Sequence, residues 1–271
     1  MSLLHASEQG TDTFTFKAND GTVDSSLATI TVTINAVAAE VTNSLGMTFK
    51  RIPSGTFTMG SPSEANQESI EVQHQVTISR AFCMQTTEIT QAQWREVMGS
   101  NPSYFSSCGD TCPVEQVSWN DLQDFFSRLN FRGEGTYRLP TEAEGEYAAR
   151  AGTTTAYSFG SSDSNLSNYA WWDSGVGGNA SETHPVAQKL PNPWGLYDMH
   201  GNVWEWVADY WSDTYSSSAV TDPQGPSSGS SQVVRGGGWY NGVGLRSALR
   251  YDNDPGLRYY GIGARVLRTN P

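Results

Sequence analysis

The stretch Arg235–Arg268, RGGGWYNGVGLRSALRYDNDPGLRYYGIGARVLR, interleaves two kinds of residue. One kind is typical of a scaffold and consists of glycines, a proline, an aromatic anchor and evenly scattered arginines. These scaffold positions are Arg235, Gly236, Gly237, Trp239, Arg246, Ser247, Ala248, Arg250, Pro255, Arg258, Gly263 and Arg265. The residues between them follow neither the alternation of a strand nor the spacing of a helical face. The stretch therefore predicts a fixed backbone with an irregular surface between its fixed points.

The residues in the gaps have the composition of an adaptable binding surface. We call them the gap positions: Tyr240, Asn241, Gly242, Val243, Gly244, Leu249, Tyr251, Asp252, Asn253, Asp254, Gly256, Leu257, Tyr259, Tyr260 and Gly261. Tyrosine supplies rigid amphipathic contact area at low entropic cost, while Gly and Asn adapt to a partner. From composition alone, an irregular Gly-rich surface loop is an equally good interpretation.

Composition bounds the class of protein. The 271 residues, 37% of them hydrophobic, can bury a full core and suit one large domain plus a small one. A net charge of -12 and a pI near 4.7 argue against binding to nucleic acid or to an anionic membrane. No run of eighteen apolar residues is present, so membrane insertion is not expected. The opening MSLLHAS lacks the pattern of a signal peptide, and we expect the chain to be a fragment of a larger protein.

The three cysteines have different environments. Cys108 and Cys112 lie in the polar turn SSCGDTC, and we expect a disulfide that stabilises by roughly 2 kcal/mol because its loop is short. Two free thiols are the alternative. Cys83 lies among apolar neighbours and is expected to be buried as a small hydrophobe.

The chain divides into two parts by its patterning. Residues 11–35 alternate as two strands with Asn19-Asp20-Gly21 as turn chemistry between them, similar to the last strands of cadherin-like or immunoglobulin-like repeats. Residues 36–44 are the candidate linker. We therefore predict a partial β-sandwich-like segment with its linker at 1–40 and a main domain at 41–271.

Three helices of the main domain have clear signals. Thr90 with Gln93 and Thr141 with Glu144 each form a capping box. A third helix is indicated by one apolar stripe, Leu122, Phe125, Phe126 and Leu129. Beyond residue 157 the chain is rich in Ser, Gly, Asn and Trp, which predicts long loops packed by aromatic rings.

Six motifs in this order resemble the formylglycine-generating enzyme family, the sulfatase-modifying-factor domain. They are GMTFKRIPSGTFTMGS (46–61), TTEITQAQW (86–94), CPVEQVSWND (112–121), YRLPTEAEGEYAARAG (137–152), NPWGLYDMHGNVWEW (192–206) and VVRGGGW (233–239). The resemblance implies an α+β, loop-rich, C-type-lectin-like fold, preceded here by the small β segment. Two departures, Gly145 and Ala264, each remove a large aromatic residue that the family usually carries, so local repacking is expected.

Within that family, the tail most resembles the variable proteins of diversity-generating retroelements, with a variable region at about 235–268. Those systems copy a template with errors confined to adenines. An AAC codon randomised at both adenines gives Tyr, Asn, Gly, Val, Leu and Asp, but never Lys, Glu, Gln, Met or Trp. All fifteen gap positions obey this restriction, although a random stretch this short can also do so.

The motif GLYDMHGNVWEW is the candidate metal site. Asp198 and Glu205 supply carboxylates, and the turn can aim the carbonyls of Gly201 and Val203 at the same point, which suits calcium. The resemblance implies a structural calcium at these four positions. The alternative is a polar turn held by hydrogen bonds. His200 lies inside this turn and is expected to be a surface side chain.

Catalysis in the resembled family uses two cysteines after the RGG motif. Asn241 stands at the first position and a residue close to Leu245 at the second, and neither is Cys. A three-histidine iron site, as in related sulfoxide synthases, is not indicated because His5, His74, His184 and His200 lack metal-ligand spacing.

These observations predict a non-enzymatic protein that binds a protein or glycan ligand on a target surface through a sequence-diversified patch. We expect a monomeric domain located outside the cell, on a cell surface or on a virus particle. Two alternatives remain: an oxygen-dependent enzyme of the same family with a displaced active site, and an invariant carbohydrate-binding surface module.

Overall fold

The computed structural model describes residues 10–34, 38–61, 70–173, 178–242 and 244–269. The chain divides into two compact units, Met1–Ala39 and Glu40–Pro271, which are described separately. None of the helices in the described residues is long and apolar enough to cross a membrane.

The first unit is a β-hairpin. Strands β1 (Gly10–Phe16) and β2 (Ala28–Ile34) pair antiparallel, with Gly10 opposite Ile34 and Phe16 opposite Ala28. In the turn, the Asp20 carboxylate accepts hydrogen bonds from the backbone N–H groups of Thr22 and Val23, both at 2.9 Å. These bonds fix the chain reversal that the Asn-Asp-Gly sequence predicts. The relation of this hairpin to an immunoglobulin-like repeat stays a prediction.

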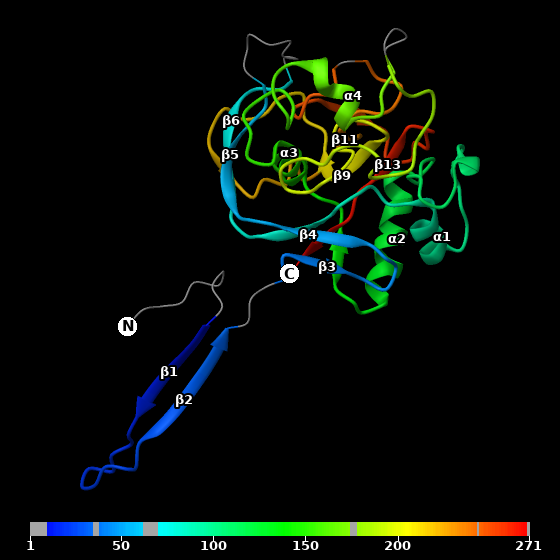
Figure 1. Cartoon of the computed structure of the whole chain (residues 1–271). Coiled ribbons are helices and arrows are strands. Elements are labelled where there is room, and N and C mark those ends of the chain that lie inside the picture. Colours follow the sequence, from blue (N-terminus) through cyan, green and yellow to red (C-terminus); the bar gives the residue numbers. More distant parts are fainter. Residues whose placement is uncertain (1–9, 35–37, 62–69, 174–177, 243, 270–271) are drawn as a thin grey trace. The chain divides into compact units, whose positions relative to one another are not determined.

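The second unit mixes short strands with four α-helices among its described residues (Figure 1). Its strands are β3 (Glu40–Thr42), β4 (Thr48–Ile52), β5 (Gly55–Met59), β6 (His74–Ile78), β7 (Phe82–Gln85), β8 (Thr136–Arg138), β9 (Trp204–Tyr210), β10 (Val220–Thr221), β11 (Gln232–Arg235), β12 (Arg250–Asn253), β13 (Ile262–Ala264) and β14 (Leu267–Thr269). Its helices are α1 (Gln91–Met98), α2 (Trp119–Phe131), α3 (Glu142–Arg150) and α4 (Leu166–Tyr169), with 3₁₀ turns at Ser106–Cys108 and Asp163–Asn165.

The strands form three sheets. A five-stranded sheet has the order β3-β4-β7-β14-β8, so the first and last strands of the unit share one sheet. A four-stranded sheet has the order β12-β11-β9-β13, in which β13 runs parallel to β9. A three-stranded sheet has the order β10-β6-β5. The four-stranded sheet thus holds β9, which begins within the motif at 192–206, together with β11, which leads into residues 235–268, and with β12 and β13 from within them.

The helices begin where the sequence predicts. The Thr90 and Thr141 hydroxyls accept the N–H groups of Gln93 and Glu144, and both capping boxes are complete. All four residues of the predicted apolar stripe on α2 are buried. Helices α1 and α2 lie side by side (Figure 1), where the rings of Trp94 and Phe125 stack with centroids 5.0 Å apart. The three helix predictions are confirmed.

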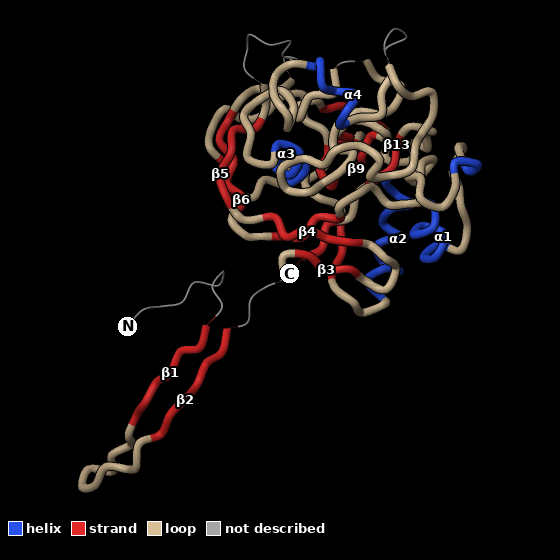
Figure 2. Tube along the Cα trace, in the orientation of Figure 1, coloured by secondary structure: helices blue, strands red, loops and turns tan. Residues whose placement is uncertain are grey.

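Long loops cover one side of the second unit (Figure 2). Between α4 and β9 the described residues contain no helix or strand. Specific contacts fix this segment instead: the rings of Trp171 and His184 stack with centroids 3.8 Å apart, and the Asn202 side-chain oxygen accepts the His184 N–H at 3.0 Å. At Gly237 the backbone has φ 75°, and a Cβ there would lie 2.1 Å from a methyl carbon of Leu245. Only glycine fits this turn, which leads the chain from β11 into the tail.

Candidate ligand-binding face

Five arginines tie the tail to the rest of the unit. Each forms an ion pair with a carboxylate from outside residues 235–268: Arg235 with Glu146 at 2.5 Å, Arg246 with Glu71 at 2.6 Å, Arg250 with Glu142 at 2.7 Å, Arg258 with Asp121 at 2.6 Å, and Arg265 with Glu205 at 2.8 Å. All but the Arg258 pair are largely buried. Leaving one partner of a buried pair alone costs about 3–5 kcal/mol. The arginines are therefore scaffold, as the sequence predicts.

Burial separates the two kinds of residue in the tail. Thirteen of the fourteen described gap positions are at least partly exposed, and Gly261 is the exception. Seven of the twelve scaffold positions are buried. Val243 lies outside the described residues. The tail thus buries most of its scaffold and leaves its gap positions accessible.

Six gap positions converge on one open hollow of about 430 Å³. They are Tyr240, Asn241, Tyr251, Asn253, Leu257 and Tyr259. Trp204, Val234 and Ile262, which belong to the neighbouring strands β9, β11 and β13, complete the lining. The structure therefore gathers gap positions from separate parts of the tail around side chains of the four-stranded sheet.

The alternation of β12 decides which of its residues face the hollow. Tyr251 pairs with Val234 of β11, and both line the hollow. Successive side chains of a strand point to opposite faces. Asn253 therefore lies with Tyr251, whereas Asp252 lies with the buried Arg250 on the other face. Asp252 belongs to the tail surface but does not line the hollow.

The remaining gap positions lie outside the hollow. Gly242 and Gly244 have open space where a Cβ would stand. Leu249 packs partly against the hydrophobic core. Asp254 accepts a hydrogen bond from the N–H of Gly256 at 2.7 Å and shapes the loop after β12. The predicted set is therefore not one uniform face.

An aromatic cluster extends the face beyond the hollow. The Tyr259 hydroxyl donates to the Tyr260 hydroxyl at 2.9 Å, and the centroids of the two rings are 4.2 Å apart. The Tyr260 ring in turn lies 5.8 Å from Trp239 and 5.8 Å from Tyr104. Tyr104 is 68% exposed. It lies about 135 residues before the tail, so the sequence offered no signal that it would join this surface.

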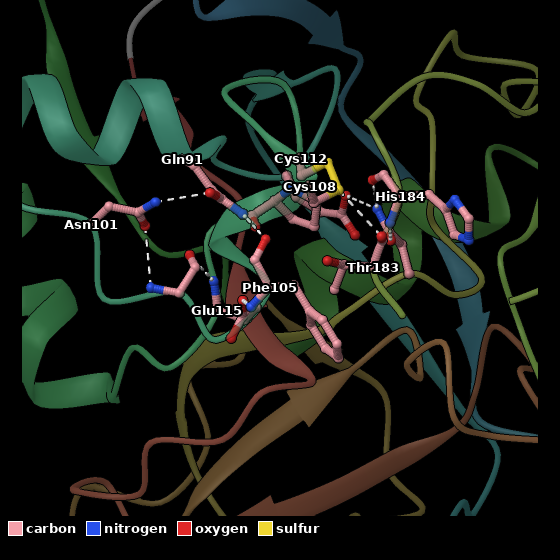
Figure 3. Close-up of a disulfide and its surroundings, with 12 residues drawn as sticks. Gln91, Asn101, Phe105, Cys108, Cys112, Glu115, Thr183 and His184 are labelled. Carbon is pink, nitrogen blue, oxygen red and sulfur yellow. Dashed lines mark hydrogen bonds between the residues drawn. A yellow bond between two sulfur atoms is a disulfide. The ribbon is translucent and has the colours of Figure 1, made fainter. Parts of the chain in front are cut away.

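The segment that carries Tyr104 leads into the predicted disulfide between Cys108 and Cys112, which is present (Figure 3). The two Glu115 carboxylate oxygens accept the N–H groups of Tyr104 and Phe105 at 3.0 and 2.9 Å. Gln91 donates to the Phe105 carbonyl at 3.1 Å. Burial raises the pKa of Glu115 to about 7, against these two hydrogen bonds. The segment is thus held from both sides, which fixes Tyr104 beside the tail. The third cysteine, Cys83, is buried as predicted.

The candidate metal residues lie in a buried acidic cluster. Asp198 is 2% exposed, and its Oδ1 has no hydrogen-bond partner. Burial raises the pKa of Asp198 to about 6. Glu205 binds Arg265, and Glu88 accepts hydrogen bonds from the Val203 N–H at 3.2 Å and the Asn202 amide at 3.0 Å. If Asp198, Glu205 and Glu88 are all ionised, their three negative charges exceed the single positive charge of Arg265 by two.

This cluster fits calcium through its chemistry. Calcium prefers oxygen ligands, and it would satisfy the unpaired Asp198 oxygen and balance the excess charge. No group of three or more His, Cys, Asp and Glu residues among the described residues is arranged to hold a metal by side chains alone. Backbone carbonyls, such as those predicted at Gly201 and Val203, would have to complete the ligand set.

The prediction that His200 is a surface side chain is wrong. It is 2% exposed, its Nδ1 lies 3.0 Å from the Leu245 carbonyl, and its Nε2 lies 3.0 Å from the Ser158 hydroxyl. Burial lowers its pKa to about 4, so the ring is neutral at neutral pH. His200 is a structural link between the motif before β9 and the tail.

The two positions aligned with the family's cysteines have structural roles here. The Asn241 side-chain oxygen accepts hydrogen bonds from the Trp204 indole at 2.7 Å and from the Gly238 N–H at 2.8 Å. Leu245 is fully buried. Neither side chain can do thiolate chemistry.

Comparisons with known proteins agree with this architecture. The family model described as sulfatase-modifying factor enzyme 1-like domain matches residues 36–270. Variable protein 1 of Treponema denticola superposes with a TM-score of 0.79 at 30% identity, covering 86% of this chain and 100% of that one. PvdO from Pseudomonas aeruginosa superposes with a TM-score of 0.75 at 27% identity, covering 84% and 97%.

Curated sequences give the same family. The formylglycine-generating enzyme of Streptomyces coelicolor is 36% identical over 169 residues, which are 55% of this chain and 48% of the enzyme. The chain spans about half the length of the formylglycine-generating enzymes that it matches. The predicted loop-rich, C-type-lectin-like α+β fold and the resemblance to variable proteins are confirmed. The chain belongs to the sulfatase-modifying factor enzyme 1-like family.

Proposed function

We propose that this protein is a non-catalytic ligand-binding protein that displays a sequence-diversified patch, as a variable protein of a diversity-generating retroelement. The observation that carries the proposal is the convergence of six gap positions on one hollow, while the tail's arginines pair with carboxylates that do not line it. A rigid frame with accessible side chains tolerates exchange, because surface substitutions usually change stability by within about 0.5 kcal/mol. The similarity to a solved variable protein supports this proposal.

The absence of catalysis is part of the proposal. Relatives in the family are enzymes, but the tail of this chain contains no cysteine. Of the three cysteines in the whole chain, Cys108 and Cys112 are joined in a disulfide and Cys83 is buried. Stoichiometric copper or iron binding, or oxygen-dependent turnover of a Cys-containing peptide, would instead favour an enzyme with a displaced site.

The proposed partner is a protein or glycan on a target surface, and the proposed location is a cell surface or a virus particle. Sequencing this gene in many individuals of one population tests the diversification directly. We expect substitutions confined to the fifteen gap positions, and nearby DNA with an imperfect repeat that differs only at adenines. Uniform copies without such a repeat would contradict the proposal and would favour an invariant surface module.

We further propose that calcium binds the Asp198 cluster as a structural ion, through Asp198, Glu205 and the carbonyls of Gly201 and Val203. Calcium at about one hundred times its dissociation constant would add about 2.7 kcal/mol of stability. Thermal unfolding in calcium and in chelator should therefore differ. Asp198→Ala should remove the difference, whereas the exposed control Asp124→Ala should retain it. Identical melting of the unaltered protein in both buffers would refute this assignment.

A further inference from the structure

We propose that the hollow receives a cationic side chain, arginine or lysine, of a protein partner. This inference rests on the proposed binding function and adds the chemical class of the ligand. It concerns the variant present in this chain, because the gap positions that line the hollow determine its chemistry.

The walls of the hollow are aromatic. Trp204, Tyr240, Tyr251 and Tyr259 contribute four rings to its lining. The Trp204 and Tyr251 centroids lie 6.3 Å apart, and those of Tyr240 and Tyr259 lie 5.6 Å apart. A guanidinium or ammonium group is attracted to the face of such rings within about 6 Å of the centroid. Several rings around one open space therefore suit a cation.

The charges near the hollow also favour a cation. None of its lining residues is charged. The three arginines adjacent in sequence to lining residues are engaged elsewhere: Arg235 with Glu146, Arg250 with Glu142 and Arg258 with Asp121. Asp252 and Asp254, on either side of the lining residue Asn253, form no ion pair with any described residue. With a net charge of -12 on the chain, the potential attracts positive partners.

Several polar groups of the lining that could recognise sugar hydroxyls are already engaged. Hydrogen bonds from the Trp204 indole and the Gly238 N–H already occupy the side-chain oxygen of Asn241. The Tyr259 hydroxyl donates its proton to Tyr260. The lining contains two side-chain amides, those of Asn241 and Asn253. Only in Asn253 are the side-chain oxygen and nitrogen both free of hydrogen bonds to described residues. The hollow therefore offers ring faces more than directed hydrogen bonds.

The extent of the aromatic surface indicates that the cation is carried by a protein. Beyond the hollow the rings continue over Tyr260 to the exposed Tyr104. Tyrosine-rich surfaces of this kind bind protein epitopes by combining rigid contact area with anchor residues. When the partner's side chain enters the hollow, the partner's backbone and neighbouring residues would lie over Tyr260 and Tyr104.

A pair of nearly isosteric probes tests the proposal on the full chain. N-acetyl-arginine amide and its neutral analogue N-acetyl-citrulline amide are titrated into the protein and followed by NMR. We expect the arginine probe to bind about fivefold more tightly or better, because the two probes have nearly the same shape and only arginine carries the charge that the ring faces attract. Tyr251→Leu should weaken the arginine probe about threefold or more and leave the citrulline probe unchanged. The control Phe131→Leu removes an aromatic ring that is 92% exposed and does not line the hollow, and it should leave both probes unchanged.

The other outcomes overturn the cation assignment. Equal affinity for the two probes, no binding of either at millimolar concentration, or a preference for a methyl glycoside would each do so. Binding to phosphatidylcholine vesicles without binding to the arginine probe would assign the hollow to a lipid headgroup instead. None of these results affects the population sequencing that tests the proposed function, so the two failures are distinguishable.

Discussion

The ring of Tyr240 occupies the space that a side chain at Gly261 would need. A Cβ built on Gly261 would lie 2.1 Å from Cε1 of Tyr240. Both are gap positions, and Gly261 is the buried one. Two positions that are predicted to vary independently are therefore sterically coupled in this variant.

We expect Gly261→Ala to destabilise the protein by about 1–3 kcal/mol, the usual cost of overpacking. Adding Tyr240→Ala should recover most of this loss, since the ring that causes the clash is gone. Chemical denaturation of the two single variants and the double variant gives the coupling energy directly. Gly242→Ala is the control, because a Cβ there meets nothing within 4 Å. Additive effects of the two substitutions would show that the ring moves away freely.

The buried ion pairs of the tail should matter far more than the exposed one. Arg250 is 2% exposed, binds both oxygens of Glu142 at 2.7 and 2.9 Å, and lies between the rings of Trp211 and Tyr215. Arg250→Ala should cost about 3–5 kcal/mol, because it leaves Glu142 buried with part of its charge unbalanced. Arg258→Ala removes a pair whose arginine side chain is 58% exposed and should cost about 1 kcal/mol or less. Equal losses of unfolding free energy in the two variants would contradict the assignment of Arg250 as a fixed point.

Short-range signals in the sequence were sufficient for the helices. A capping box joins residues three apart, so Thr141 and Glu144 contain the whole signal between them. The arginines could be recognised as scaffold, but their partners could not: Arg250 binds a carboxylate 108 residues away. His200 was misjudged for the same reason, since its partners Ser158 and Leu245 lie 42 and 45 residues away.

The candidate face was predictable only in part. The alternation of fixed and gap positions located the tail surface, and six of its residues do line one hollow. The contributions of Trp204 and Tyr104 depend on β9 and the segment before the disulfide being brought beside the tail. Only the three-dimensional pairing of distant segments supplies that information.

Filling the space beside Gly145 should stabilise the protein. This residue lies inside α3 where the family usually carries Trp, and it borders a cavity of about 20 Å³. A Cβ at Gly145 would meet only a methyl group of Val207 at 3.8 Å. Gly145→Ala should therefore raise the unfolding free energy by about 1 kcal/mol through helix propensity. In contrast, Gly263→Ala should destabilise, because its Cβ would lie 2.5 Å from the Val114 carbonyl oxygen. A lower melting temperature for Gly145→Ala would show that this cavity does not accept a methyl group.

The carboxyl group of Asp209 should make stability depend on pH. Burial, followed by the charge of Glu142, raises its pKa from 3.8 to about 7. Between these values the folded state holds a proton that the unfolded chain has lost. The contribution of Asp209 is therefore complete below pH 4 and declines as the pH rises to about 7. The shift corresponds to at most about 4 kcal/mol.

Asp209→Asn is the matched test, because the amide oxygen can still accept the Glu142 N–H that Asp209 binds at 2.7 Å. Denaturation of both proteins between pH 4 and pH 8 isolates the titration of this one group. We expect the unfolding free energy of the unaltered protein to fall relative to that of the variant as the pH rises. Parallel profiles would mean that Asp209 ionises at its ordinary pKa despite its burial.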